Sequence, residues 1–254
     1  MSDTPLAFDD AFEILGPALP GDEVVLVGGQ ALNYWVSYYR DREPSLKEAG
    51  LVTSDDVDFY GLRDAALRMK QALAGSDLKL PKFGDATPNS ALLVFKDRAG
   101  IERRIDFLWS VHGVDDKRVR ETAVEVELLN QLGEPTGLHL RVLHPVLCLI
   151  SRVHNTATWS IYQTPRGVAQ ATAAIACARG FLSERCQGGE IRIAHNSIRF
   201  IGELARSSAG KKVYAEFGLD VLAAIPRDLR LGDSFLRKQL PKLYDVAGRV
   251  FDIR

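Results

Sequence analysis

The chain has 254 residues and a formal net charge of −1, with 32 Lys and Arg against 33 Asp and Glu. Its 46% hydrophobic and 26% charged residues match ordinary globular usage, which excludes a fibrous or disordered chain. The near-neutral charge also excludes a protein that coats nucleic acid by bulk electrostatics alone. At this length we expect two domains of moderate size.

The cysteines and the N-terminal residues indicate a compartment. Cys148, Cys177 and Cys186 form no CxxC or Cys/His pair, and their odd number favours a reducing environment over a disulfide framework. Residues 1–10 (MSDTPLAFDD) lack the basic and apolar regions of a signal peptide. No stretch approaches the roughly 18 uninterrupted apolar residues of a membrane span. We therefore expect a cytoplasmic protein with no membrane partner.

The first half of the chain alternates strand and helix patterns. Residues 24–27 predict a short strand, Gly28-Gly29 a turn, and the spacing of apolar residues from Ala31 to Tyr39 a helix. Residues 40–50 contain a proline and several charges, and they predict a surface loop. Further strands are expected over 56–60, 91–95, 101–109, 124–129 and 138–143, with a helix over 62–74 and hairpin connections at 96–100 and 133–137. The first half is therefore predicted to be α/β.

Beyond His144-Pro145 the period-two pattern disappears, and apolar residues recur at spacings of three and four. Helices are predicted over 145–156, 165–186, 191–207, 211–225 and 233–251. The predicted organisation is thus an α/β domain over residues 1–143 and a helical domain over residues 144–254.

The strongest chemical signal is a set of three aspartates in the first half. Asp56 and Asp58 are two residues apart on a predicted strand, so their carboxylates share one face at a spacing of about 6 to 7 Å. Asp106 lies between two apolar residues on another predicted strand and faces away from them. Three such carboxylates brought together select Mg²⁺ or Mn²⁺, the ions that stabilise attacking and leaving oxygens in phosphoryl transfer.

The Gly28-Gly29 turn supplies a complementary feature. Glycine lets the backbone approach a phosphate, and the helix that follows begins with free N–H groups at the positive end of its dipole. The turn therefore predicts a site for the phosphates of a nucleoside triphosphate, whose bridging metal the aspartates hold.

In order along the chain, residues 27–32 (VGGQAL), 54–59 (SDDVDF) and 104–107 (RIDF) resemble the pattern of the nucleotidyltransferase superfamily. The Gly-Gly-x-Ala-Leu version is most similar to the AbiEii-type toxin nucleotidyltransferases of bacterial toxin-antitoxin and phage-defence systems. The resemblance implies a mixed β-sheet flanked by helices, followed by a helical domain. The distance from Gly29 to Asp56 is longer than usual in that family, which requires residues 40–50 to be an insertion.

Carried over residue by residue, the resemblance implies that Gly28 and Gly29 contact the triphosphate. It implies metal ligation by Asp56, Asp58 and Asp106, with Asp106 also the base near the incoming hydroxyl. Ser54 would touch the γ-phosphate. Arg152 would take the place of a family lysine that neutralises phosphate.

The implied activity is transfer of a nucleoside monophosphate, or a short run of nucleotides, from a nucleoside triphosphate to an acceptor hydroxyl. The acceptor would be tRNA or a protein side chain, and the resemblance implies a neutralising antitoxin protein as partner. Two alternatives stay open. One is a small-molecule nucleotidyltransferase of the antibiotic-modifying kind, and the other is a non-catalytic nucleotide-binding or interaction module on the same fold.

Overall fold

The computed structural model of the chain describes residue 16 and residues 24–48, 56–82, 84–85, 87–97, 99–129, 134–226 and 235–246. The described residues form a mixed α/β structure and fall into two compact units. The first unit is drawn from residues 1–34 and 51–144, and the second from residues 35–50 and 145–254. Each unit has its own architecture.

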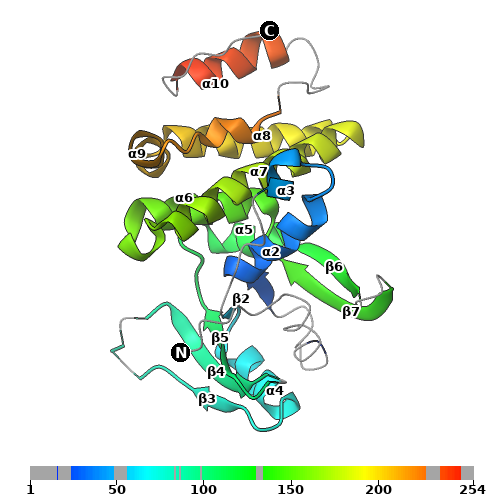
Figure 1. Cartoon of the computed structure of the whole chain (residues 1–254), viewed down its shortest axis with the longest axis vertical. Coiled ribbons are helices and arrows are strands. Elements are labelled where there is room, and N and C mark those ends of the chain that lie inside the picture. Colours follow the sequence, from blue (N-terminus) through cyan, green and yellow to red (C-terminus); the bar gives the residue numbers. More distant parts are fainter. Residues whose placement is uncertain are drawn as a thin grey trace. The chain divides into compact units, whose positions relative to one another are not determined.

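A mixed β-sheet forms the first unit. Its strands in the described part of the chain are β1 (Val25–Val27), β2 (Val57–Tyr60), β3 (Asp77–Lys79), β4 (Asn89–Lys96), β5 (Glu102–Leu108), β6 (Val124–Leu129) and β7 (Pro135–Val142). The order across the sheet is β3-β4-β5-β2-β1-β7-β6. The β2/β5 and β1/β7 pairs are parallel and the other pairs antiparallel. Figure 1 shows β3, β4 and β5 side by side.

The alternation of side chains along the strands separates the two faces of this sheet. Ile105 and Phe107 on β5 are fully buried, and so is Phe59 on β2. The rings of Phe59 and Phe107 lie 5.9 Å apart, in contact across the two strands. Because successive side chains on a strand point to opposite faces, Asp58 and Asp106 share the other face. The hydrophobic core thus packs against the face that carries Phe59 and Phe107, and Asp58 and Asp106 lie on the opposite face.

Helices complete the first unit. Helix α2 (Gly28–Tyr39) follows β1 directly and passes into the second unit after Tyr34. Helix α4 (Arg63–Ala72) buries its two alanines at 65 and 66 together with Met69, and it contacts β3 and β4. Helix α5 (Asp116–Thr122) is joined to β2 by Arg120, which donates to the Tyr60 hydroxyl at 2.7 and 2.9 Å.

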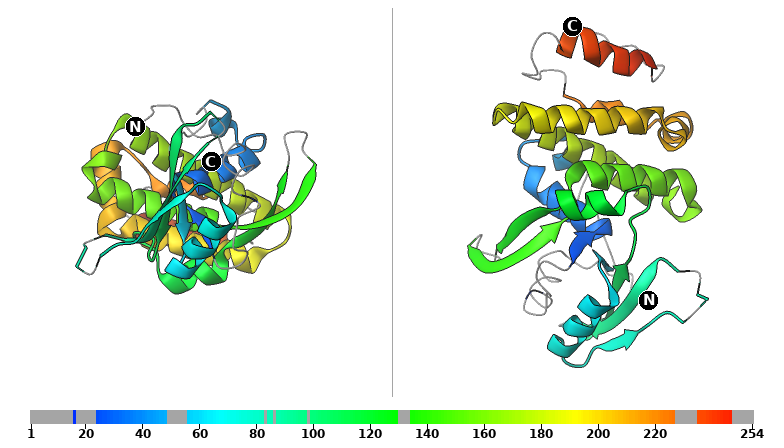
Figure 2. Two further views of the ribbon diagram at one scale, coloured as in Figure 1. Left: turned by 90° about the horizontal axis from the view of Figure 1, so that it is seen from below. Right: turned by 180° about the vertical axis from the view of Figure 1, so that it is seen from behind.

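The second unit is helical. Its described elements are α3 (Pro44–Glu48), α6 (Pro145–Thr158), η3 (Ser160–Tyr162), α7 (Pro165–Gln187), α8 (Ile191–Arg206), α9 (Ser208–Phe217), η4 (Val221–Ala224), η5 (Phe235–Gln239) and α10 (Leu240–Val246). Helix α7 is the longest, and both α6 and α8 contact it (Figure 2). An alanine-rich buried face lets these helices approach one another closely.

The surface loop predicted for residues 40–50 is wrong. Residues 44–48 form α3, and Leu46 in this helix is fully buried. The carboxylate of Glu43 accepts two hydrogen bonds from Arg179 on α7, at 2.7 and 2.9 Å. The sequence hides this arrangement because its buried apolar contact is a single leucine among charged residues, and the charges are satisfied by a distant helix.

The single helix predicted over 211–225 is also wrong. Helix α9 ends at Phe217, because Gly218 adopts a left-handed conformation with φ +69°. The separate turn η4 then begins at Asp220, whose side chain accepts a hydrogen bond from the Leu222 amide. Two elements that the sequence does not predict, β3 and α5, are short and carry little apolar periodicity. Within the described ranges, no helix combines the length and apolar character needed to cross a bilayer.

Candidate active site

Asp58 and Asp106 lie next to each other on the same face of the sheet. Strands β2 and β5 are parallel neighbours, and their register places the Cα of Asp58 opposite the Cα of Asp106. Neighbouring strands are about 4.8 Å apart, so the two carboxylates project side by side. Both residues are partly buried. Of the residues predicted from the sequence, these two are therefore brought together by backbone pairing.

Asp56 lies just before β2 and acts on the same group electrostatically. Burial raises the pKa of Asp106 above its usual value, and the charge of Asp56 raises it further. A hydrogen bond from Asn89 and the charge of Arg104 act in the opposite direction. Because a charge must be close to shift a pKa in this way, Asp56 belongs to the same acidic cluster. We call Asp56, Asp58 and Asp106 the aspartate cluster.

The glycine turn lies directly against this cluster. Gly28 is the first residue of α2 and has φ +65°. A Cβ atom added to it would stand 1.9 Å from Oδ2 of Asp58 and 2.7 Å from its Cγ. Only glycine therefore fits, both because of its backbone conformation and because of the carboxylate beside it. This contact places the N-terminal end of α2 next to an anion, an arrangement that the helix dipole favours.

Two residues near the cluster escaped the sequence interpretation. The Asn89 side chain donates a hydrogen bond of 2.5 Å to Oδ1 of Asp106 and so restrains that carboxylate. Arg104 precedes Asp106 by two residues and shares its face of β5, where its charge lowers the pKa of Asp106. The spacing of Arg104 from Asp106 was visible in the sequence. Nothing in the sequence connects Asn89 with Asp106, because only the pairing of β4 with β5 joins them.

Three further site residues were predicted from the sequence, namely Gly29, Ser54 and Arg152. Gly29 follows Gly28 in the first turn of α2 and is buried. Ser54 lies outside the described residues. Arg152 belongs to α6 in the helical unit, where it is 6% exposed. Its guanidinium donates to the Gln170 side chain on α7 at 3.0 Å and lies over the ring of Tyr162, so Arg152 links helices within that unit.

The donors of the aspartate cluster suit a hard divalent cation, because carboxylate oxygens are the ligands that Mg²⁺ and Mn²⁺ prefer. Among the residues that the structure describes, no group of three acidic, histidine or cysteine side chains is arranged as a ready metal site. The aspartate cluster thus offers the kind of oxygen donors that such a cation prefers.

Comparison with known proteins adds no assignment, since neither a family model nor a curated protein matches the chain. The function must therefore be argued from the glycine turn and the aspartate cluster.

Proposed function

We propose that the chain is a metal-dependent nucleotidyltransferase, which transfers a nucleoside monophosphate from a nucleoside triphosphate to an acceptor hydroxyl. The observation that supports it best is the position of Asp58, which lies against Gly28 on one side and beside Asp106 on the other. A phosphate-binding turn and a pair of carboxylates are the two parts that phosphoryl transfer needs next to each other.

In this proposal Asp56, Asp58 and Asp106 hold Mg²⁺ or Mn²⁺. The ion, when bound, neutralises phosphate charge and stabilises the attacking and leaving oxygens. Ion binding requires rotation of the carboxylates rather than movement of the strands, because backbone pairing already fixes Asp58 beside Asp106. The backbone amides of Gly28 and Gly29 bind phosphate oxygens. Phosphate contacts of Ser54 and Arg152 stay expectations from the sequence resemblance.

Asp106 is the proposed general base. Its raised pKa gives its carboxylate a greater affinity for a proton than an ordinary surface aspartate has. The acceptor hydroxyl transfers its proton to Asp106 while its oxygen attacks the α-phosphorus. The bond from that phosphorus to the bridging oxygen breaks, and pyrophosphate leaves with the electron pair. Asn89 restrains the carboxylate while this happens, which makes it a positioning residue.

The biological setting follows from the sequence resemblance alone. We propose a cytoplasmic toxin of the AbiEii-like type, with tRNA or a protein side chain as acceptor and an antitoxin protein as its neutralising partner. A small-molecule nucleotidyltransferase would use the same cluster with a different acceptor.

The second candidate function is a non-catalytic nucleotide-binding module. It is favoured by the finding that no described group of three side chains is set up to bind a metal. The two candidates differ in one measurable property, since the enzyme transfers the nucleotide covalently and the module only binds it.

The test incubates the purified protein with Mg²⁺, each α-labelled nucleoside triphosphate, and total tRNA or cell lysate. Label should appear on RNA or protein with the native chain and be lost with Asp58→Asn. Asp64→Asn is the matched control, because Asp64 is an exposed aspartate on α4 of the same unit and should keep full activity. Transfer that survives Asp58→Asn would disprove the mechanism. Saturable triphosphate binding without transfer would support the module.

A further inference from the structure

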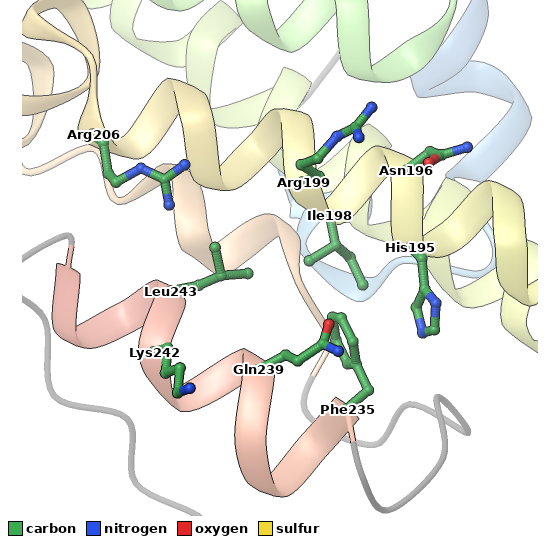
Figure 3. Close-up of a pocket in the computed structure, with 9 residues that line it drawn as sticks. All are labelled: His195, Asn196, Ile198, Arg199, Arg206, Phe235, Gln239, Lys242 and Leu243. Atoms are coloured by element: carbon green, nitrogen blue, oxygen red, sulfur yellow. The ribbon is translucent and has the colours of Figure 1, made fainter.

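The helical unit contains a cavity of about 410 Å³ between α8 and the segment formed by η5 and α10. Figure 3 shows that its lining side chains come from these two sides. Cavities that hold small ligands usually measure ~300–1,000 Å³, so this one is large enough for a mononucleotide. All of its described lining residues belong to the helical unit, whereas the aspartate cluster belongs to the other unit.

One end of the cavity is aromatic. The imidazole of His195 on α8 stacks on the ring of Phe235, with 4.4 Å between centroids and 19° between planes. The Nε2 atom of His195 is buried and has no hydrogen-bond partner among the residues that the structure describes. Gln239 extends toward the same end (Figure 3) and adds an amide that both donates and accepts.

The other end is cationic. Arg206, the last residue of α8, and Lys242 on α10 come from the two facing sides at that end, together with Leu243 on α10 (Figure 3). Neither cation forms an ion pair with any residue that the structure describes. Arg199 also lines the cavity, but its guanidinium points away from α10 (Figure 3) and forms a 3.9 Å pair with Glu203. Among the described residues that line the cavity, none is acidic. The charge in this cavity therefore favours an anion.

We propose that this cavity binds a nucleoside monophosphate, or a closely similar ligand in which a planar heterocycle carries a phosphate monoester. The heterocycle contacts Phe235 and the apolar side chains of Ile198 and Leu243, and its polar edge pairs with the side-chain amide of Gln239. The phosphate lies between Arg206 and Lys242, where charge-assisted hydrogen bonds hold it. The heterocycle of this ligand matches the aromatic end of the cavity, and its phosphate matches the cationic end. A free anion would make no contact with the aromatic end, and an uncharged nucleoside would make no contact with the cationic end.

The test measures AMP binding to the full chain by calorimetry in metal-free buffer, and follows the His195 ring signals by NMR. The His195 signals are assigned by their absence from His195→Gln. AMP should shift them at saturation, inorganic phosphate should bind more weakly than AMP, and adenosine more weakly still. Arg206→Gln and Lys242→Met should each weaken AMP binding about tenfold, the effect of one lost charge-assisted hydrogen bond. Asp58→Asn should leave AMP binding unchanged, which separates this cavity from the proposed active site.

Arg192→Gln is the matched control. It removes an exposed cation from α8 that does not line the cavity, and AMP affinity should stay within about twofold. The proposal is overturned if AMP leaves the His195 signals unmoved, if phosphate binds as tightly as AMP, or if Arg206→Gln and Lys242→Met bind AMP like the native chain. The proposal is also overturned if a short single-stranded RNA displaces AMP from the chain and excess AMP does not displace that RNA. The two variants lie on separate helices, so either one alone tests the cationic end if the other fails to fold.

Discussion

Oδ2 of Asp58 occupies the space that any side chain at residue 28 would need, 1.9 Å from the position of its Cβ. Gly28→Ala should therefore be strongly destabilising. The left-handed backbone at φ +65° alone costs about 1–2 kcal/mol with a Cβ atom, and displacement of Asp58 adds to this. We expect a lower urea midpoint and the loss of nucleotide transfer.

Gly75→Ala is the control for this substitution. Gly75 has φ +75° in the same unit, but a Cβ atom there would meet nothing within 4 Å. It should show only the backbone cost, with transfer intact. If both variants lost equal stability, the contact between Gly28 and Asp58 would carry no energetic weight.

The pH dependence of stability should report on Asp106. Burial, followed by the charge of Asp56, raises the pKa of Asp106 above its usual 3.8, so the folded protein binds this proton more tightly than the unfolded chain does. The stabilisation from this proton is complete below pH 3.8 and is lost as the pH rises through the raised pKa. At neutral pH the ionised carboxylate of Asp106 therefore destabilises the folded protein.

Asp106→Asn removes this charge, and its side-chain oxygen can still accept the hydrogen bond from Asn89. In metal-free buffer the variant should be more stable than the native chain at pH 7, and the advantage should shrink toward pH 4. Urea midpoints of both proteins, measured between pH 4 and pH 7, test the sign of this difference in stability. A difference that did not vary with pH would show that ionisation of Asp106 has no part in it.

Asn89→Ala should change the chemistry of Asp106 without removing it. The hydrogen bond from Asn89 lowers the pKa of Asp106, so its loss should move that pKa further upward. Transfer should fall about tenfold at neutral pH, the effect of losing one hydrogen bond to a charged group. Carboxyl ¹³C NMR titration measures the pKa directly.

Ser90→Ala is the matched comparison, because the Ser90 hydroxyl donates to the carbonyl oxygens of Gly61 and Phe107 and makes no contact with Asp106 in those bonds. Ser90→Ala should leave the pKa of Asp106 unchanged. An unchanged Asp106 pKa in Asn89→Ala would remove Asn89 from the site.

In the helical unit, the ion pair between Glu43 and Arg179 should contribute measurably to stability. Glu43 is only 7% exposed, and both its oxygens accept from the Arg179 guanidinium. Glu43→Gln leaves a partly buried guanidinium with a weaker partner, which should cost about 1.5–3 kcal/mol in urea unfolding. Glu203→Gln breaks an exposed pair with Arg199 and should cost less than about 1 kcal/mol. Equal costs would contradict the role assigned to the buried pair.

Short-range patterns predicted the parts of the site that lie on single strands. Alternation along 56–60 and 101–109 put Asp58 and Asp106 on one face of their strands, and the glycine pair marked the start of α2. Both features depend only on residues that are neighbours in the chain, so they can be predicted from the sequence. The register that sets Asp58 beside Asp106 depends on pairing between distant segments, which no periodicity encodes.

The same reasoning explains what was missed. Asn89 reaches Asp106 only because β4 pairs with β5, and Glu43 is buried only because Arg179 on α7 neutralises it. The segment 40–50 has the composition of a loop, and its structure comes from tertiary contacts that override local preference. Polar residues that are fixed by distant partners are thus the ones that sequence patterns find hardest to interpret.

The parallel pairing of β1 with β7 joins Leu26 to Val142, at the two ends of the first unit's sequence. During synthesis, β1 leaves the ribosome long before β7 exists, so one of its edges stays open while most of the unit is translated. An unpaired apolar strand edge attracts other chains. The three valine and leucine residues of β1 thus make the nascent chain most prone to aggregation until the last strand of the sheet emerges and covers them.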